Sequence, residues 1–559
     1  MYAHSNYIDL MERVLSAYSS EDIDRYFQDV RTNGLKEHGF PRLTANIGIL
    51  IAHGRRTDLL DRFIAMMDLC CQEIPQVKAA NDFSVREVVC AILELEKSNA
   101  VPAAKLLYWK DLLKTISPAA CYNVYAKDPS DDVHNWAAFT LTSEYMRRAS
   151  GLADANREFI DLQAYSQLRR LDKNGMYRDP HEPMVYDLVT RGLFALLLNE
   201  GYEGEYKEAW QQTLEKTAIP TLLMQSVTGE IPYGGRSSQF IHNEAMIAIL
   251  FEYYAKCYAR RSDMETAGKF KAASKRALDS ISDALSSTPI SHIKNRFPVS
   301  SRYGCEKYAY FDKYMITAAS YLYTACRLCD PSIPEFELDD NTGATWQTTE
   351  HFHKLFMRAG EYFAEYDYCA DTNYDASGLG RLHRKGAPSA ICLSLPGTDK
   401  PNYEINSADG VPFAIVPEFF DGKNWISGAD SSVSHKIIRH SALKESAEAV
   451  ITLCHQDKEA VKSTYLLDKN GLHITAESKS ETGILLPAFK FDGEEHPEIN
   501  FSGNTLSVKY QNWLCRYQAE AGTICDTGKV GYNRNGHYAI FSIRGKERAA
   551  VIIEITCVK

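Results

Sequence analysis

The chain has 559 residues, of which 45% are hydrophobic and 24% charged, and its formal net charge is −11. This length and composition are typical of a globular protein with a large core and about two to four domains. The negative charge and the lack of lysine or arginine runs exclude nucleic-acid and polybasic membrane contacts.

The first residues lack the basic start and apolar centre of a signal peptide. No apolar run reaches the about 18 residues of a membrane span. The 14 cysteines form no framework, and Cys326 and Cys329 lie in an apolar helical pattern, which predicts core thiols. We therefore expect a cytoplasmic protein without a membrane partner.

Residues 1–370 are predicted to form a helical domain. Apolar residues recur at helical spacing in about 14 segments, the last at 349–366. Residues 193–202 and 314–329 are apolar on more than one face, which is typical of helices buried on two sides. Helices in sequential pairs predict an (α/α) toroid or a solenoid, and the lack of a fixed-period repeat argues against a regular array. We therefore expect an (α/α) toroid, an incomplete barrel of six or seven helix pairs.

Residues 371–559 are predicted to form an antiparallel β-sandwich. Short strand-like runs follow one another along this part of the chain, and Asn470-Gly471 predicts a β-hairpin between two of them. The predicted strands lie at residues 390–396, 412–420, 448–456, 463–468, 472–478, 537–543 and 549–558.

Residues 229–258 contain the clearest candidate site. Gly234-Gly235 permits a tight turn, and Ser237-Ser238 can cap the helix that follows. Polar side chains then gather near the start of this helix, namely Arg236, Gln239, His242 and Asn243. The pattern predicts a site for an anionic or sugar ligand, although capping and turn formation alone would also account for it.

Three further polar stretches lie between predicted helices. They contain His134, Asn135 and Trp136; then Tyr177, Asp179, His181, Tyr186 and Arg191; and finally Arg296, Arg302, Tyr303, Tyr308, Tyr310 and Tyr314. Alternate loops of an (α/α) toroid open on the same rim, so these stretches can converge on one cleft.

Tyr, His, Asn and Arg together suit β-elimination on a uronate. The proton beside a sugar carboxylate is weakly acidic until Asn and Arg neutralise the carboxylate by hydrogen bonding and charge. A His or Tyr can then take this proton, and a Tyr can protonate the leaving glycosidic oxygen. A tyrosine base needs a neighbouring cation, for which Arg236 is the candidate.

The domain order and these motifs resemble the toroid-plus-β-sandwich polysaccharide lyases, which include chondroitin, hyaluronan, heparinase and alginate lyases. In the chondroitin and hyaluronan branch, an Asn-Trp pair precedes a His…Tyr stretch, and a Gly-Arg stretch follows. Here about 50 residues separate Asn135-Trp136 from Tyr186, and about 50 more lead to Arg236. The resemblance implies that Asn135 and Arg236 neutralise the carboxylate while His181 and Tyr186 transfer protons.

Two features depart from these patterns. His181 lies near two prolines, unlike its counterpart in the first branch. The heparinase and alginate branch uses an adjacent Asn/His pair and a later Tyr, which His242-Asn243 and Tyr303 imitate in reversed order. His242 and Tyr303 are therefore second-rank catalytic candidates.

The resemblance also implies a substrate and its binding residues. The partner would be an acidic polysaccharide or oligosaccharide, no cofactor would be required, and a structural divalent metal in the β-sandwich stays open. His383 stands at the domain junction, where it either contributes to the cleft or belongs to a solvated basic loop. The substrate-binding candidates are His134, Trp136, Tyr177, Tyr233, Gln239, Asn243, Arg302, Tyr308 and His383.

Two other classes of function remain. An (α/α)-barrel glycoside hydrolase acting on a glucuronyl or related sugar would need two carboxylates beside the scissile bond. Carboxylates in the candidate stretches are Asp179, Glu182, Asp187, Glu230 and Glu244. A non-catalytic carbohydrate-binding protein would use the same polar residues without forming a product.

Overall fold

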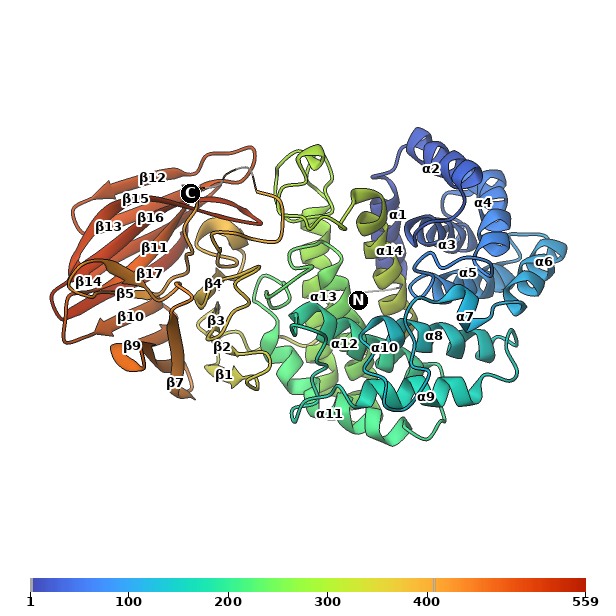
Figure 1. Ribbon diagram of the computed structural model, residues 1–559, viewed down its shortest axis with the longest axis horizontal. Helices are drawn as coiled ribbons and strands as arrows, with labels where there is room; N and C mark the ends of the chain where they lie inside the picture. Colours follow the sequence, from blue (N-terminus) through green and yellow to red (C-terminus); the bar gives the residue numbers. More distant parts are fainter. Residues whose placement is uncertain (1–3, 406, 408, 559) are drawn as a thin grey trace.

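The computed structural model describes residues 4–405, 407 and 409–558. Helices form the first part of the molecule and antiparallel sheets form the second, with the two parts side by side (Figure 1). The predicted toroid followed by an antiparallel β-sandwich is confirmed. None of the described helices is long and apolar enough to cross a membrane.

The helical part contains 14 α-helices within the described residues. They are α1 His4–Leu15, α2 Ser20–Asn33, α3 Gly39–Ala52, α4 Leu60–Glu73, α5 Val85–Ser98, α6 Ala103–Lys114, α7 Pro118–Cys121, α8 Trp136–Ala149, α9 Arg157–Leu168, α10 Met184–Asn199, α11 Lys207–Met224, α12 Asn243–Arg260, α13 Met264–Ala284 and α14 Phe311–Leu328.

Six of these helices form an inner ring. In the order α3, α5, α8, α10, α12 and α14, each packs against the next, and α14 packs back against α3. The other long helices lie outside them, as α1 does beside α14 and α13 beside α12. Helices α10 and α14 are buried along most of their length, as their apolar faces predicted. The ring of inner helices is therefore closed, whereas the sequence predicted an incomplete barrel.

The second part contains 17 strands within the described residues. They are β1 Ala344–Gln347, β2 Lys354–Ala359, β3 Tyr362–Asp367, β4 Gly378–Arg384, β5 Pro417–Phe420, β6 Trp425–Ser427, β7 Val433–Ala442, β8 Ala447–His455, β9 Lys458–Asp468, β10 Gly471–Glu477, β11 Thr482–Phe491, β12 Glu498–Ser502, β13 Thr505–Tyr510, β14 Trp513–Ala521, β15 Thr523–Asn533, β16 Gly536–Gly545 and β17 Arg548–Cys557.

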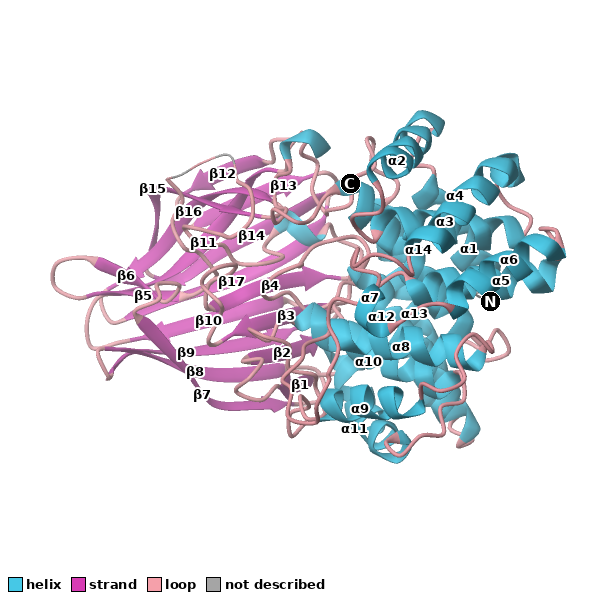
Figure 2. Ribbon diagram, turned by 45° about the vertical axis from the view of Figure 1, so that its right-hand side comes forward, coloured by secondary structure: helices cyan, strands magenta, loops and turns pink. Residues whose placement is uncertain are grey.

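These strands form three antiparallel sheets. One sheet has the order β12-β13-β14-β17-β10-β9-β8-β7, and a second has the order β15-β16-β11-β5-β6. A shared apolar core joins them, as expected for a sandwich. The third sheet, β1-β2-β3-β4, lies between the helices and the two larger sheets (Figures 1 and 2).

The third sheet corrects one prediction from the sequence. The helix predicted at residues 349–366 is wrong, because β2 and β3 occupy most of this segment. Both strands are buried at every position, so their sequences lack the alternation of a half-exposed strand. Strands thus begin at Ala344, well before the predicted domain boundary at residue 371.

Two further predictions from the sequence concern the β-sandwich. The hairpin at Asn470-Gly471 is confirmed, since Gly471 pairs with Asp468 between β9 and β10. The strand predicted at residues 390–396 is wrong, because a short 3-10 helix at Ser389–Ile391 and one isolated bridge occupy this segment.

Buried charges connect the third sheet to the toroid. The Arg381 guanidinium on β4 lies 3.2 Å from a Glu365 oxygen and 3.5 Å from a Glu230 oxygen. Arg381 also donates to the carbonyl oxygen of Ile231 at 2.6 Å, and its side chain is fully buried. Without this guanidinium each buried carboxylate would keep only one lysine contact, at 3.3 Å and 3.7 Å, and losing a buried partner costs far more than losing an exposed pair.

We therefore predict that Arg381→Met lowers the free energy of unfolding by about 3–5 kcal/mol. Arg516→Met is the matched control, because Arg516 and Glu554 form an exposed pair at 3.8 Å, and it should cost at most about 1 kcal/mol. Urea unfolding followed by circular dichroism measures both. Equal losses in the two variants would contradict a structural role for the buried network.

Candidate functional site

Polar residues that precede the inner helices meet at one rim of the toroid. Asn135 precedes α8, and its main-chain N–H and Nδ2 donate to Asp179 Oδ1 at 2.9 and 2.8 Å. Arg236, in the loop before α12, forms an ion pair with Asp179 Oδ2 and donates to the Pro180 carbonyl oxygen at 2.7 Å. Three loops that are distant in sequence are thereby joined at a single carboxylate.

Tyr186 lies directly under this ion pair. The guanidinium carbon of Arg236 is 4.7 Å from the centre of the Tyr186 ring, a cation–π contact. The phenolic oxygen is 3.0 Å from Ser237 Oγ. Burial raises the pKa of Tyr186, while the charge of Arg236 opposes this rise by favouring the phenolate.

Ser237 connects Tyr186 to the loop before α14. Its Oγ is also 3.0 Å from the hydroxyl of Tyr308, whose side chain is 38% exposed. Its main-chain N–H donates to Glu306 Oε1 at 2.6 Å, and its carbonyl oxygen accepts from Asn243 Nδ2 at 3.0 Å. Ser237 is buried, so protein atoms enclose its hydroxyl on several sides.

The β-sandwich supplies the cation that holds Glu306. Arg534, in the turn between β15 and β16, donates to both Glu306 oxygens at 2.7 and 3.0 Å. It also donates to the Gly304 carbonyl oxygen at 2.7 Å, and its side chain is fully buried. The position of the Ser237 main chain therefore depends on a residue from the other domain.

Asp375 reaches the rim from the loop between β3 and β4. Its Oδ2 accepts the N–H of Gly235 at 2.7 Å, and the carboxyl group is buried. Burial raises the pKa of Asp375 to about 7, against the opposing influence of Lys354 and the Gly235 N–H. The turn that carries Arg236 thus rests on a carboxyl group that titrates near neutrality.

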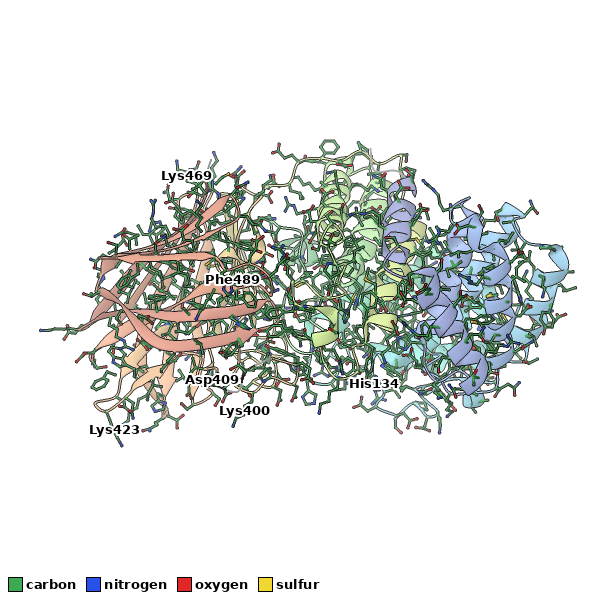
Figure 3. The ribbon with its side chains drawn as sticks, turned by 90° about the horizontal axis from the view of Figure 1, so that it is seen from above. His134, Lys400, Asp409, Lys423, Lys469 and Phe489 are labelled. Carbon is green, nitrogen blue, oxygen red and sulfur yellow. The ribbon has the colours of Figure 1, made fainter. Side chains whose placement is uncertain are left out.

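An aromatic group borders the rim beside Asn135. The ring centres of His134 and Trp136 are 5.8 Å apart, and those of Trp136 and Phe83 are 4.8 Å apart. Both His134 and Trp136 are partly exposed, and burial lowers the pKa of His134. Figure 3 labels His134 on the same edge of the molecule as Lys400 and Asp409 of the β domain.

The structure therefore brings several predicted residues together. Asn135, Tyr186, Arg236 and Tyr308 share the rim, with His134 and Trp136 beside them. Two other predicted residues make hydrogen bonds that support the loops of the rim. Asn243 holds the Ser237 carbonyl oxygen, and Gln239 Oε1 lies 3.4 Å from Asn535 Nδ2.

Two predicted catalytic histidines have different environments. His181 is exposed and has a left-handed backbone with φ 64°, directly after Pro180, whose carbonyl oxygen accepts from Arg236. His242 is buried against Phe240, with ring centres 5.5 Å apart. Burial lowers the pKa of His242 to about 3, so it is a neutral ring at physiological pH.

Other predicted residues lie away from solvent. The Tyr177 hydroxyl donates to Gln167 in the helical core at 2.6 Å. Tyr233 is fully buried, with Lys354 Nζ 3.3 Å from its ring centre. Tyr303 stacks on a neighbouring phenylalanine and donates to the Gly536 carbonyl oxygen at 3.2 Å. All three side chains are buried in this structure. Tyr177 and Tyr233 are therefore not exposed to a substrate as predicted, and Tyr303 is not exposed for the catalytic role predicted for it.

Two basic candidates are engaged within the protein. His383 Nδ1 lies 2.7 Å from Ser226 Oγ, and burial lowers the pKa of His383 to about 3. The solvated basic loop considered for His383 is therefore wrong. Arg302 donates to the carbonyl oxygens of Glu306 and Lys307 at 3.0 and 2.7 Å, so it shapes the loop that carries Tyr308.

Sequence reasoning missed three residues of the site. Glu306 stands only two positions before Tyr308, and its charge within that polar stretch was the available signal. Asp375 and Arg534 come from the β domain, where only long-range folding brings them to the rim. Among the described residues, no group of three or more His, Cys, Asp or Glu could hold a metal ion.

No protein-family model and no curated protein matches the sequence. Among solved structures, a heparan sulfate lyase from Pedobacter heparinus is similar, with 9% identity and a TM-score of 0.48, over 93% of this chain and 76% of that chain. A chondroitin AC lyase from Streptomyces coelicolor has 10% identity and a TM-score of 0.46, over 99% and 79%. A family 88 glycosyl hydrolase from Bacteroides vulgatus has 11% identity and a TM-score of 0.37, over 58% and 99%.

The neighbours thus include lyases of the superfamily that the sequence motifs resemble. They also include a hydrolase.

Asp375 gives a prediction about stability and pH. Its pKa is about 7 in the folded protein and about 3.9 in an unfolded chain. Between these values the folded state holds a proton that the unfolded state lacks, so this group's contribution to stability is lost as pH rises through 7. Asp375→Asn keeps an acceptor for the Gly235 N–H and should remove this loss. Relative to the wild type, its free energy of unfolding should rise by up to about 4 kcal/mol between pH 4 and pH 8.

The measurement is urea unfolding of both proteins across that pH range. Asp111→Asn is the control, since Asp111 forms an exposed pair with Lys114 at 3.0 Å. It should show no such trend, and a flat profile for Asp375→Asn as well would contradict the raised pKa.

Proposed function

We propose that the protein is a lyase that cleaves a uronic-acid-containing polysaccharide or oligosaccharide by β-elimination. The observation that carries this proposal is the Tyr186 phenol beneath the Arg236 guanidinium, at a rim shared with Asn135 and Tyr308. A phenol beside a fixed cation can act as a base, because the cation stabilises the phenolate.

Arg236 is suited to binding the substrate carboxylate. A guanidinium has five N–H donors, and its contacts with Asp179 and Pro180 use two of them. Its side chain is 22% exposed, so the remaining donors can reach a ligand. Hydrogen bonds to the carboxylate would spread its negative charge as the adjacent C–H bond breaks.

Asn135 takes a more limited part than the sequence implied. One amide hydrogen is donated to Asp179, and its buried Oδ1 has no hydrogen-bond partner among the described residues. Asn135 is only 1% exposed, so its amide acts through the Asp179 carboxylate that pairs with Arg236 and does not itself reach a ligand. The amino ends of α8, α10 and α12 also approach the rim, and their dipoles favour an anionic ligand.

The carboxylates at the rim favour elimination over hydrolysis. A glycoside hydrolase needs two carboxyl groups beside the bond, one of them able to donate a proton. Asp179 accepts from Asn135 and Arg236, and Glu306 is held by Arg534 through two hydrogen bonds. Both oxygens of each carboxylate are already engaged by these donors and both residues are buried, so neither carboxyl group faces a glycosidic bond.

Hydrolysis is the second candidate because of Asp375. The raised pKa of this carboxyl, about 7, is what a general acid requires. Its burial beneath Gly235 is the argument against this role, because a substrate would have to displace the turn to reach it.

We expect the protein to form an unsaturated uronate, detected by ultraviolet absorbance, from a panel of uronic-acid polysaccharides and oligosaccharides. Tyr186→Phe should reduce this rate by about 100-fold or more, because it removes the group that transfers the proton. Tyr165→Phe is the control, since Tyr165 is 38% exposed on α9, and it should retain wild-type activity.

The other outcomes separate the alternatives. Release of reducing ends without absorbance, lost in Asp375→Asn, would establish hydrolysis instead of elimination. Binding of a glycan that weakens in Arg236→Ala, with neither product formed, would identify a carbohydrate-binding protein.

A further inference from the structure

Ser237 adopts a backbone conformation that serine rarely occupies. Its φ of 62° lies in the left-handed region, where a side chain carries a steric cost that glycine avoids. Four side chains hold it there, because Glu306 binds its N–H, Asn243 binds its carbonyl oxygen, and the two tyrosines bind its Oγ. A strained backbone fixed by this many contacts is typical of functional sites, where a side chain must point in one direction.

That direction places one hydroxyl midway between two phenols. Ser237 Oγ lies 3.0 Å from the hydroxyl of Tyr186 and 3.0 Å from that of Tyr308. A serine hydroxyl has one donor hydrogen and two acceptor lone pairs. It can therefore accept a proton from one tyrosine while donating its own to the other, which is the arrangement of a proton relay.

The two phenols are not equivalent. Tyr186 is partly buried, and Arg236 stands 4.7 Å over its ring. Tyr308 is 38% exposed, and no cation–π contact to its ring is found in the described part of the chain. Arg236 offsets part of the rise that burial causes in the pKa of Tyr186, so Tyr186 gives up its proton more readily than Tyr308. Tyr308 is the accessible phenol that stays protonated.

We propose that Tyr186 is the base and Tyr308 the acid of the elimination, and that Ser237 passes the proton from Tyr186 back to Tyr308. This inference rests on the proposed lyase function. It assigns Tyr308 as the catalytic acid, and Ser237 as a positioning residue that links the two phenols.

The step balances without any further reagent. The Tyr186 phenolate takes the proton beside the uronate carboxylate, and the electron pair of that C–H bond forms the new C=C bond. The C–O bond to the leaving sugar breaks, and Tyr308 gives its proton to that oxygen. Tyr186 then passes its proton to Ser237 Oγ while Ser237 gives its own to the Tyr308 phenolate, which restores the starting state.

The first test is the pair Ser237→Ala and Ser238→Ala. Alanine at 237 removes the hydroxyl and keeps the side-chain carbon, so we expect kcat for formation of the unsaturated product to fall about 10- to 100-fold with little change in KM. Added imidazole, a small proton carrier, should restore part of this loss. The Ser238 hydroxyl is buried next to Ser237 and has no partner among the described residues, so its loss should leave kcat within about twofold.

The second test uses a substrate whose leaving group needs no proton, a uronate that carries a 4-nitrophenyl ether at the cleaved position. Tyr308→Phe should be impaired on the natural linkage yet close to wild type on this ether. Tyr186→Phe should be inactive on both, because it lacks the base. This test does not depend on the folding of the Ser237 variant.

The outcomes distinguish the relay from the lyase proposal. Wild-type elimination with Ser237→Ala as active as Ser238→Ala would overturn the relay alone. Tyr308→Phe that is equally impaired on both substrates would overturn the assignment of Tyr308 as the acid. Wild-type release of reducing ends without an unsaturated product would overturn both proposals together.

Discussion

The ion pair between Arg534 and Glu306 sets the position of the groups at the rim. Glu306 uses the same carboxylate to bind Arg534 and the Ser237 N–H, so the cation of one domain fixes the backbone of the other. Both side chains are buried, and a carboxylate in that position would be costly without its counter-ion. The orientation of Ser237 towards the two tyrosines follows from this contact.

The closed inner ring explains why distant loops can act together. Because an outer helix lies between successive inner helices, the amino ends of α8, α10 and α12 reach the same rim. Asp179 then joins the loops before α8 and α12 by accepting from Asn135 and Arg236. The toroid supplies the electrostatic setting, while Asp375 and Arg534 of the β domain support the loop that completes it.

The sequence predicted those features of the fold and the site that leave a local pattern of residues. Helical periodicity predicted the toroid, and the spacing of Asn135, Tyr186 and Arg236 predicted residues that do meet. It failed at β2 and β3, since strands buried on both faces show no alternation. It also failed for Arg534, whose partner lies 228 positions earlier in the chain and has no local signature.

That separation has a consequence for synthesis of the protein. The apolar core of the toroid includes no described residue beyond Leu338, so it can form before the two larger sheets have been made. The turn that carries Arg534 emerges only after β15. A nascent chain can therefore hold a folded toroid while Glu306 still lacks its cation, so the site forms only once the turn between β15 and β16 has been made and has docked on the toroid.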